Sequence, residues 1–572
     1  MRPRLWLRHA PCDDDVDALS RAAGVSRVLA QLLWLRGLRD AESVAKFLTP
    51  SLEDLHDPFR LADMMPAVVR IEAAIARQEP IAVHGDYDVD GITSTVMLKR
   101  ALELLGARVQ YFIPERFKDG YGLQVPAVER LASEGVRLLV SVDCGIRSQP
   151  AAARAREVGL DLIITDHHEP EAALPPAVAV INPKRADCAY PDKFLAGAGV
   201  ALKLVQALCA RAGRSKWLPS FVKVAALGTL ADVVPLVGEN RVIAKLGLAG
   251  LSIGPNNVGL RMLLESTRLA GRAIDSHHVA YVLAPRINAA GRMSTPDLAA
   301  RLLLLTDERL ADEARDLASR LSDENTRRQQ EEQGVLEQAK RQIERDPDVG
   351  AHNMLVLAGD QWHRGIIGIV ASKLVDAFHK PVIVLSVEQG LAQGSCRSIP
   401  SFDMLAALDT CADLFERYGG HRQAAGFTLD AARLGELRQR LYAHADGTLN
   451  PDDLRPRLHL DASLRFTEIT PDLVEALNRL APFGCANPRP VFEASGIEIL
   501  GGPSIMKERH LSMTVRQEGR LFRAVAWRSA ERLPQLQQHR QSIDLAFSVA
   551  ENSWRGNSAI ELEVADIRIP SA

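Results

Sequence analysis

The stretch 84-HGDYDVDGITSTVML-98 places three alternating aspartates, the first at Asp86, directly before a glycine. An EF-hand calcium loop begins in the same way, but it needs a preceding helix and a bidentate glutamate at loop position 12. Position 12 counted from Asp86 is Met97, and the preceding residues 79-EPIAVHG-85 have the composition of a buried strand. The sequence therefore excludes an EF-hand and leaves a choice between a solvated acidic turn and a metal site at the end of a strand.

Short apolar runs alternate with helical stretches between residues 80 and 195. The strand-like runs cover residues 80–85, 108–114, 137–145, 160–168 and 177–183, and the helical stretches between them cover residues 92–106, 125–135 and 150–159. Strands that alternate with helices of about 10–15 residues predict βαβ units around a parallel sheet. The expected fold class is therefore α/β, with a doubly wound parallel sheet.

Side chains that can bind metal follow several of these strands. Asp86 and Asp88 follow the first strand, Asp143 the third, and the triplet 166-DHH-168 the fourth. Asp232 lies farther on in the apolar stretch 228-GTLADVVPL-236, where an unpaired carboxylate would be costly to bury. Because the carboxyl ends of parallel strands line one crevice, we expect these residues to converge.

Convergence of several carboxylates predicts bound cations. Neighbouring carboxylates raise one another's pKa unless a cation neutralises them. Carboxylate and imidazole ligands without cysteine favour Mn²⁺ or Mg²⁺. Two such ions about 3.5–4 Å apart can hold a hydroxide for in-line attack on phosphorus. The cluster is therefore interpreted as a catalytic site with two metal ions.

The rest of the chain contains a long helix and two further regions. Residues 306–345 have no proline, carry apolar residues near helical spacing in their first part (Leu310, Ala314, Leu317, Leu321), and are polar on every face in their middle. We expect that middle part to bridge two domains through solvent. Residues 353–445 again alternate strands with a helix, and short strands near the C-terminus predict a small OB-type β-barrel.

These patterns divide the chain into five expected segments. They are an N-terminal extension packed on the catalytic domain (1–75), a catalytic metal-binding domain (76–305), a long connecting helix (306–346), a second, smaller α/β domain for substrate binding (347–445) and an OB-type single-strand-binding domain (455–572).

Composition limits the class of protein. The 69 basic and 72 acidic residues give a net charge of −3, so any nucleic-acid surface has to be local. The seven cysteines are scattered without a CxxC pair, which argues against a zinc ribbon or a disulfide framework and suits a reducing cytoplasm. Since the sequence has no signal-peptide core and no apolar run of membrane length, we expect a cytoplasmic protein without a membrane partner.

Several motifs occur in a fixed order along the chain. They are D-x-D-x-D-G at 86–91, V-D-x-G at 142–145, D-H-H at 166–168, GTLADVVPL at 228–236, PRINAAGRM at 285–293, GSCRS at 394–398, GGHRQAAGF at 419–427 and PFGCANPRPVF at 482–492. Together they resemble the DHH phosphoesterase superfamily and, within it, the bacterial 5′→3′ exonucleases specific for single strands. The resemblance covers almost the whole chain.

The resemblance implies metal ligands at Asp86, Asp88, Asp143, His167, Asp232 and His84. It makes Asp143 the bridge between two ions. It assigns Asp88, His167 and Asp232 to one ion, and Asp86 to the other with possible help from His84. A purely structural role for His84 is the alternative.

The resemblance also assigns supporting roles beside the metals. His168 faces the scissile phosphate as a hydrogen-bond donor or general acid. Asp166 orients the neighbouring imidazoles. Asp90 is expected to hold the loop that Gly91 allows to bend.

Contacts to the substrate are expected from both α/β regions. The implied residues are Arg116, Ser395 and Arg397 for the 5′-terminal phosphate, Gly419, Gly420 and His421 for a close phosphate contact, Asn288 for the substrate, and Arg286 for the charge on the transferred phosphoryl group. Arginine suits this role because its planar fork meets two phosphate oxygens. A surface ion pair is the plain alternative for each arginine.

The C-terminal region carries a basic, partly aromatic surface. Its residues are Lys507, Arg509, His510, Arg516, Arg520, Arg523, Arg528 and Arg532, with Phe522 and Trp527 among them. OB folds hold single strands in such a groove without reading the sequence. Trp527 is equally compatible with a place in the core.

The expected activity is exonucleolytic hydrolysis of single-stranded DNA from the 5′ end, with release of nucleoside monophosphates, during recombination and repair. The resemblance implies single-strand-binding protein and a RecQ-type helicase as partners of a monomeric enzyme. The first alternative is a DHH-type phosphodiesterase for short oligonucleotides or cyclic dinucleotides, which would not need the barrel. The second is a DNA-binding scaffold without catalysis, which the complete ligand set disfavours.

Overall fold

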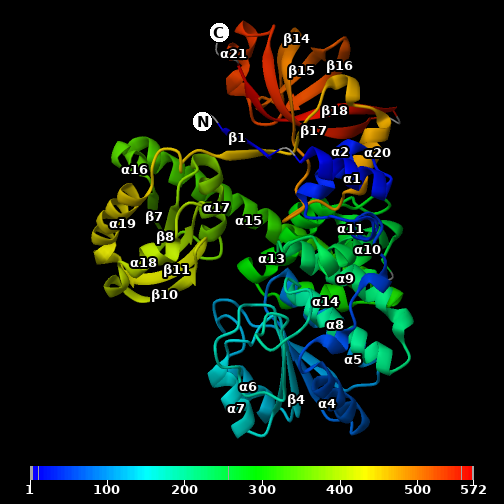
Figure 1. Ribbon diagram of the computed structural model, residues 1–572. Helices are drawn as coiled ribbons and strands as arrows, with labels where there is room; N and C mark the ends of the chain where they lie inside the picture. The colour runs from blue at the N-terminus through cyan, green and yellow to red at the C-terminus, as the bar shows by residue number, and fades with distance from the viewer. Residues whose placement is uncertain (1–3, 11, 256, 555–556, 570–572) are drawn as a thin grey trace. The chain divides into compact units, whose positions relative to one another are not determined.

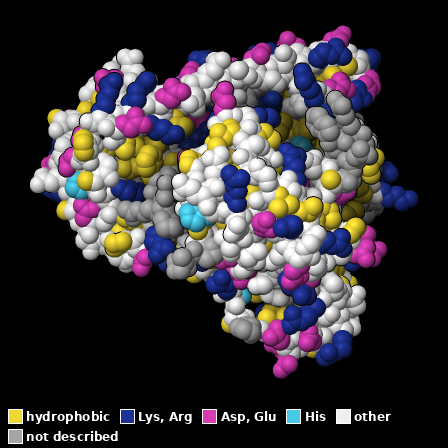
Figure 2. Space-filling view, turned by 90° about the horizontal axis from the view of Figure 1, so that it is seen from above, with side chains coloured by type: hydrophobic (Ala, Val, Ile, Leu, Met, Phe, Trp, Pro, Cys, Tyr) yellow, Lys and Arg dark blue, Asp and Glu magenta, His cyan; other side chains and the backbone are white. Residues whose placement is uncertain are grey.

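The computed structural model describes residues 4–10, 12–255, 257–554 and 557–569 (Figure 1). Two compact units divide the chain. The first comprises residues 1–7, 292–294 and 322–458, and the second comprises residues 8–291, 295–321 and 459–572. Basic and acidic side chains are interspersed over the face shown in Figure 2, which agrees with the net charge of −3.

A five-stranded parallel sheet lies within the second unit, in the order β3-β2-β4-β5-β6. Its strands are β2 (Ile81–His84), β3 (Val109–Phe112), β4 (Leu138–Val142), β5 (Asp161–Thr165) and β6 (Ala179–Ile181). All neighbouring strands pair in parallel. The predicted doubly wound parallel sheet is confirmed.

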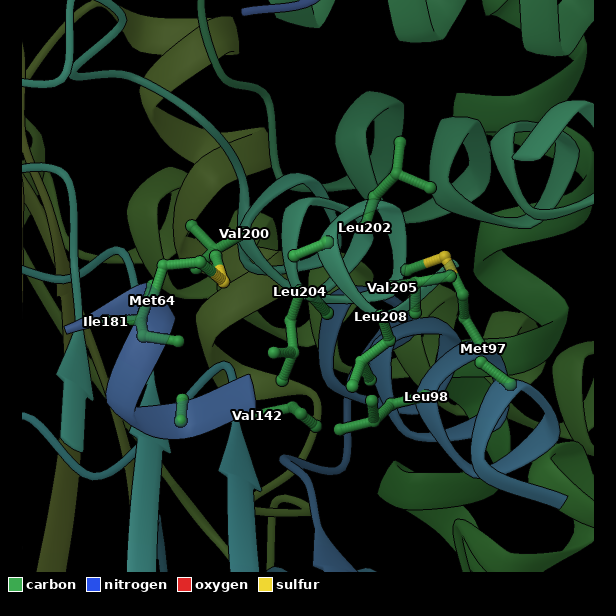
Figure 3. Packing of buried hydrophobic residues seen from close by; sticks show 14 of the residues in the cluster. Met64, Met97, Leu98, Val142, Ile181, Val200, Leu202, Leu204, Val205 and Leu208 are labelled. Atoms are coloured by element: carbon green, nitrogen blue, oxygen red, sulfur yellow. The ribbon is translucent and has the colours of Figure 1, made fainter. Parts of the chain in front are cut away.

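Helices cover both faces of this sheet because its strands bury side chains in both directions. The helices α4 (Met64–Ala76), α5 (Val89–Leu104), α8 (Gly197–Arg211) and α9 (Leu218–Ala231) share one core with alternate strand residues such as Val140. The helices α6 (Val125–Ser133) and α7 (Gln149–Glu157) share another core with residues such as Leu139. Figure 1 shows α6 and α7 on the side of β4 opposite to α4. Figure 3 shows Leu204 and Leu208 of α8 among the apolar side chains of the first core.

A helical region follows the sheet. Its elements are α10 (Gly238–Ile253), α11 (Val258–Ser266), α12 (Ser276–His278), a π-helical turn (Val279–Leu283), α13 (Ala284–Met293), α14 (Asp297–Leu304) and α15 (Ala311–Arg345). Short 3₁₀ turns occur at Leu52–Asp54, Pro58–Arg60, Ser215–Trp217, Glu308–Leu310, Ala412–Leu414, Ala431–Arg433, Phe466–Glu468 and Ala530–Arg532. No helix among the described residues is both long and apolar enough to cross a bilayer.

The long helix α15 differs from the expectation in two respects. Leu310, expected in its apolar stripe, precedes the helix and is exposed, whereas Leu317 and Leu321 are buried. The middle of the helix, expected to bury nothing, buries the polar side chains of Asn325 and Glu332. Glu332 forms ion pairs with Arg328 and with Lys373 of α17. Pairing of charges rather than apolar burial explains why this contact has no hydrophobic pattern.

The first unit contains a five-stranded mixed sheet in the order β10-β11-β9-β8-β7. Its strands are β7 (Leu355–Asp360), β8 (Val382–Glu388), β9 (Leu391–Arg397), β10 (Phe415–His421) and β11 (Ala424–Asp430). Its helices are α16 (Pro347–Ala351), α17 (Ile367–Phe378), α18 (Met404–Asp409) and α19 (Leu434–Thr448). The predicted second α/β region is confirmed.

The C-terminal strands form an OB-like closed barrel. Its elements are β13 (Ala462–Ser463), α20 (Pro471–Arg479), β14 (Phe492–Met506), β15 (His510–Gln517), β16 (Arg520–Ala526), α21 (Leu533–Gln538), β17 (Ile543–Trp554) and β18 (Asn557–Arg568). The sheet order is β13-β14-β15-β16-β18-β17, and β14 also pairs with β17, which closes the barrel.

The N-terminal segment divides between two cores. Its first strand β1 (Leu5–Arg8) pairs with β12 (Arg457–Leu460). The helices α1 (Asp13–Ala23), α2 (Arg27–Leu35) and α3 (Ala41–Leu48) share a core with the barrel strands, whereas α4 packs beneath the parallel sheet. Residues of α10 also contact α3, through the hydrogen bonds from Arg241 to the Phe47 carbonyl and from Lys245 to the Leu48 carbonyl. The expected packing of residues 1–75 on the catalytic domain therefore stays a prediction, and the core that α1 to α3 share with the barrel adds to it.

A buried arginine joins three parts of the second unit. Arg241 of α10 is 2% exposed, and its guanidinium lies 3.6 Å from the centre of the Phe47 ring. It donates to the carbonyl oxygens of Phe47 at 2.7 Å, Arg479 at 3.3 Å and Ala481 at 3.1 Å. Burial, with Arg36 nearby, lowers the pKa of Arg241 to about 9. One cation thus caps α3 and α20 through carbonyl groups.

Replacement of this arginine should loosen the joint. Arg241→Ala removes the hydrogen bonds to the carbonyl groups of Phe47, Arg479 and Ala481, of which the bond to Phe47 is buried, and we expect a loss of stability of about 3 kcal/mol. Thermal unfolding measures the loss, and hydrogen exchange should increase in α3 and α20. Arg211→Ala is the matched control, because Arg211 forms an exposed ion pair with Glu72 that contributes about 1 kcal/mol or less. Equal effects of the two substitutions would contradict the role of Arg241.

Candidate metal centre

The polar residues that follow three strands of the parallel sheet lie close together. Asp86 and Asp88 follow β2, Asp143 follows β4, and His167 follows β5. Asp88 is the N-cap of α5 and accepts a hydrogen bond from the Gly91 N–H at 3.0 Å. Asp143 has a φ of 59°, the left-handed conformation, which turns its side chain away from the strand direction.

Gly91 lies within the first turn of α5 and not in a loop, contrary to the expectation. A Cβ atom at Gly91 would lie 2.5 Å from both the backbone nitrogen and the backbone oxygen of Asp86. The absence of a side chain therefore lets α5 approach the aspartate segment closely. Asp90 also belongs to this helix and does not hold a loop.

The ligand atoms form three overlapping groups, in each of which all atoms lie within 4.8 Å of one another. The groups are Asp86, Asp88 and Asp143; Asp143, His167 and His168; and Asp90, His167 and Asp232. His167 Nε2 lies 3.2 Å from Asp143 Oδ1, 3.6 Å from Asp232 Oδ2 and 3.9 Å from Asp90 Oδ2. The predicted convergence of the aspartates and His167 is thus present in the structure.

Asp90 is a member of this cluster that sequence reasoning placed only in support. Its two carboxylate oxygens accept hydrogen bonds from the N–H groups of Gly197 and Ala198, both at 2.7 Å. These groups begin α8, and the positive end of a helix stabilises a carboxylate there. Asp90 therefore connects the metal centre to α8, and its Oδ2 atom also faces His167.

Asp232 lies at the end of a helix, next to apolar residues such as Leu230. It is the C-cap of α9, and its side chain is 27% exposed. The next residue, Val233, has a left-handed φ of 59° and is 68% exposed. Solvent can therefore reach one side of the cluster.

Four buried atoms of the predicted metal ligands lack a hydrogen-bond partner within the described part of the chain. They are Asp86 Oδ1, Asp143 Oδ1, His167 Nε2 and His84 Nε2. Burial together with the neighbouring carboxylates raises the pKa of Asp86 to about 8 and that of Asp232 to about 7. The same causes raise the pKa of Asp143 well above its ordinary value. Divalent cations would give the unpartnered atoms a partner and would neutralise the charge of the clustered carboxylates.

The donor set is rich in oxygen, with imidazole and no thiolate. This combination suits Mn²⁺ or Mg²⁺. Burial lowers the pKa of His167, so its ring is neutral and can bind a metal. The residues present therefore fit divalent metal ions.

His84 occupies a different environment. Its Nδ1 atom lies 3.6 Å from Cys144 Sγ, and its ring packs against Phe112 with 5.3 Å between the ring centres. Burial lowers the pKa of His84 to about 4, so the ring is neutral. It belongs to none of the three ligand groups found among the described residues. Its Nε2 atom is buried without a hydrogen-bond partner among the described residues, so the metal-ligand role and the structural role of His84 both stay predictions.

His168 is held from both sides. Its Nδ1 atom lies 2.7 Å from Asp166 Oδ1, and its Nε2 atom lies 3.3 Å from the hydroxyl of Tyr121. Burial lowers the pKa of His168, but the hydrogen bond and charge of Asp166 outweigh this effect and raise it to about 8. Asp166 also accepts from the Ile146 N–H at 2.9 Å, which fixes the carboxylate. His168 is thus an oriented hydrogen-bond donor.

Tyr121 was missed by sequence reasoning, because its partner is 47 residues away. It belongs to an aromatic group at this edge of the sheet. The Tyr87 and Tyr121 rings are 6.2 Å apart, and the Arg116 guanidinium lies 4.4 Å from the centre of the Tyr87 ring. The expected phosphate-binding residue Arg116 therefore lies beside the segment that carries Asp86 and Asp88.

Helix α13 supports the same segment from another direction. Asn288 Oδ1 accepts a hydrogen bond from the Val89 N–H at 3.2 Å. Arg286, on the same helix, donates to the Val282 carbonyl at 2.6 Å. The oxygen of Asn288 is therefore bound to the protein, although the sequence suggested a substrate contact.

The other expected substrate residues lie together in the first unit. In the sheet register, His421 and Arg397 both pair with Ala424, so one row across β10, β11 and β9 brings them close. Ser395 lies two residues from Arg397, and a Cβ atom at Gly368 of α17 would lie 2.9 Å from Ser395 Oγ. Gly419 and Gly420 precede His421 on the exposed strand β10.

Comparisons with known proteins now bear on this geometry. The DHH family, N-terminal domain, matches residues 80–229; the DHHA1 domain matches 351–445; and the RecJ OB domain matches 460–566. The Bacillus subtilis protein named single-stranded-DNA-specific exonuclease RecJ is 38% identical over 573 residues, which cover 99% of this chain and 71% of that protein. The chain belongs to the RecJ family.

Two further relatives extend this match. The RecJ of Escherichia coli is 32% identical over 588 residues, covering 99% of this chain and all of that protein. The crystal structure of RecJ from Thermus thermophilus in complex with Mn²⁺ has a TM-score of 0.85 and 34% identity, covering 100% of this chain and 81% of that one. The Mg²⁺ complex of the same RecJ has a TM-score of 0.80.

A methyl group at Gly197 tests the crowding around Asp143. A Cβ atom there would lie 2.4 Å from Asp143 Oδ1, so Gly197→Ala should displace this carboxylate. We expect Mn²⁺ affinity, measured by titration calorimetry, to fall by about 10–100-fold. Gly334→Ala is the control, because a Cβ atom there meets nothing within 4 Å. Unchanged Mn²⁺ binding in Gly197→Ala would contradict the placement of Asp143.

The raised pKa values predict how stability depends on pH and metal. Without metal, the native state holds protons on Asp86 and Asp232 that the unfolded chain has released, so stability should fall as pH rises through about 7 to 8. Mn²⁺ needs the ionised carboxylates, so its stabilising effect should grow over the same range. Melting temperatures between about pH 6 and about pH 8.5, with and without Mn²⁺, measure both trends. A metal effect independent of pH would contradict this interpretation.

Proposed function

We propose that this chain is a single-stranded-DNA-specific exonuclease that hydrolyses phosphodiester bonds from the 5′ end and releases nucleoside monophosphates. One observation carries the proposal. The carboxylates and the imidazole converge at the strand ends, with unpartnered atoms on Asp86, Asp143 and His167. The relatives from Bacillus subtilis and Escherichia coli, which match 99% of this chain, are named single-stranded-DNA-specific exonucleases.

Two Mn²⁺ or Mg²⁺ ions bound here would supply an activated water and charge neutralisation at phosphorus. Asp143 is shared by two of the three ligand groups, which makes it the candidate bridging ligand. Asp86 and Asp88 would serve one ion, and His167 and Asp232 the other. This grouping moves Asp88 to the side of Asp86, where the sequence had assigned it to His167.

His168 is proposed to act on the scissile phosphate directly. Asp166 holds its Nδ1 side, so the Nε2 side can donate a hydrogen bond to a phosphate oxygen. The Tyr121 hydroxyl now fills that position. Arg286 is proposed to stabilise the charge that develops on the phosphoryl group, in line with the role of arginine at phosphates.

Recognition of a 5′ end is proposed to come from phosphate contacts. Arg116 in the second unit and the Ser395, Arg397 and His421 group in the first unit are the candidates. A terminal phosphate carries one more ionisable oxygen than an internal one, so clustered donors would favour it.

The barrel is proposed to hold the single strand. Trp527, for which the sequence allowed a core position, is 51% exposed, and its ring meets His510 edge-on with 4.9 Å between the ring centres. Three of the candidate arginines are instead held by acids, in the pairs Arg516–Glu498, Arg523–Glu561 and Arg532–Asp566. Trp527 with the basic turn Lys507–Arg509 is therefore the favoured contact.

The expected cellular setting is proposed as well. A monomer in the cytoplasm would work beside single-strand-binding protein and a RecQ-type helicase, which supply single strands. Phosphodiesterase activity on short oligonucleotides or cyclic dinucleotides is the alternative outcome for the same metal chemistry.

Labelled substrates separate these activities. With Mn²⁺, we expect 5′-labelled single strands to release labelled mononucleotide at once, 3′-labelled strands to release it late, and duplexes to resist. Asp143→Ala should reduce hydrolysis by about three orders of magnitude or more, since metal ions contribute several kcal/mol to the transition state. Its binding of single strands, measured by fluorescence anisotropy, should persist. Preferred cleavage of dinucleotides over long strands would support the phosphodiesterase alternative.

A further inference from the structure

A π-helical turn interrupts the helical path that leads to the metal centre. It spans Val279–Leu283, and the N–H of Ala284 donates to the carbonyl of Val279, five residues earlier. Such turns are rare and frequently occur at functional sites. Helix α13 begins directly after it and carries Arg286 and Asn288, of which Asn288 binds the aspartate segment through Val89.

The π turn changes which side chains share a face. In a regular α-helix, residues five apart point about 140° away from each other, as 3.6 residues per turn requires. The i to i+5 hydrogen bond of a π turn brings such residues closer to the same side. Tyr281 and Arg286 are five apart across this turn. Tyr281 and the candidate phosphate-binding Arg286 are therefore expected to be nearer to one face than they would be in a regular helix.

Tyr281 is 71% exposed, unusual for a ring of this size. The ring of His277, four residues earlier, lies beside it with 4.8 Å between the ring centres and 34° between the planes. His277 is itself exposed. The two rings therefore support each other at the surface without entering a core.

Contacts on the other side connect this pair to the barrel. Ser276, next to His277, donates to the Phe483 carbonyl at 2.7 Å. The Arg489 guanidinium lies 5.2 Å from the centre of the Phe483 ring, and β14 of the barrel begins at Phe492. Phe483 and Ser276 therefore connect the segment before the barrel to the helical path that leads into α13.

The charges beside the pair suit a polyanion. Arg286 follows in α13 and donates to the carbonyl of Val282, the residue after Tyr281, and Arg489 lies against Phe483, whose carbonyl accepts from Ser276. The one nearby acid that belongs to α12 is its N-cap Asp275, whose carboxylate oxygen lies 2.7 Å from His278 Nδ1. The carboxylate of Asp275 is therefore already in contact with His278.

We propose that Tyr281, supported by His277, is a stacking platform for a base of single-stranded DNA between the barrel and the metal centre. The inference rests on the proposed function and adds a contact that no comparison assigns. Stacking accepts every base, because each base has a π face. Arg286 and Arg489 would contact the flanking phosphates. The strand would thus be held by alternating rings and cations.

Binding of strands with single abasic sites tests the platform. Anisotropy is measured in EDTA, so that no hydrolysis consumes the strand, with labelled oligo-dT of about 20 nucleotides. For the wild-type protein, loss of a base at the position over Tyr281 should weaken binding by about tenfold, whereas loss at distant positions should not. Tyr281→Ala should weaken binding of the intact strand by about the same factor and abolish the effect of that abasic position.

Conservative and matched variants separate stacking from packing. Tyr281→Phe keeps the π face and should bind like the wild type, whereas Tyr281→Leu keeps bulk alone and should bind like Tyr281→Ala. Ile253→Ala, which alters a side chain that is 90% exposed at the end of α10, should have no effect. Melting temperatures confirm that each variant is folded.

The outcomes decide between the two levels of the proposal. Equal binding by Tyr281→Leu and the wild type, or an abasic pattern unchanged in Tyr281→Ala, would overturn the platform alone. Failure of the wild-type protein to bind single strands at all would overturn the proposed function. Tenfold loss restored by phenylalanine would support the platform.

Discussion

Repulsion among buried carboxylates is the constraint on which the second unit depends. Parallel pairing of β2, β4 and β5 fixes the strand ends, so Asp86 and Asp143 cannot move apart without breaking backbone hydrogen bonds. Their pKa values are raised because burial and mutual charge both oppose ionisation. The sheet therefore stores an electrostatic cost that divalent cations would remove, so the affinity for metal originates in the strand pairing itself.

The crowding around these carboxylates explains glycines that no periodic pattern indicates. A Cβ atom at Gly197 would meet Asp143, and one at Gly228 would lie 2.6 Å from Asp90 Oδ1. Both helices must approach the ligands closely, because α8 supplies N–H groups to Asp90 and α9 ends at Asp232. The glycines are consequences of the site, not of the helices that contain them.

The sequence predicted what depends on local pattern. Strands alternate with helices and are followed by acidic residues, and this pattern predicted both the parallel sheet and the convergence of Asp86, Asp143 and His167. Long-range polar contacts were not accessible in this way. Asp90 is held by backbone groups 107 and 108 residues later, and the middle of α15 is anchored by charge pairing through Glu332. Neither contact produces a periodic pattern of hydrophobic residues in the sequence. The core shared by the barrel and the first helices was also not predictable, because it joins segments more than 400 residues apart, as the Gln31–Asp461 hydrogen bond shows.

The distribution of charge bears on how such a chain can hold a nucleic acid. Its net charge is −3, and several barrel arginines are already paired with acids, so fewer cations are available to displace counterions from DNA. Affinity that came from phosphate contacts alone would fall steeply with salt. Stacking on exposed rings such as Trp527 and Tyr281 depends far less on salt and ignores base identity. An exonuclease must advance along its strand by one nucleotide after each hydrolysis. A combination of stacking and a few phosphate contacts suits this movement, because the ring can stack on the next base while the cations hold the backbone.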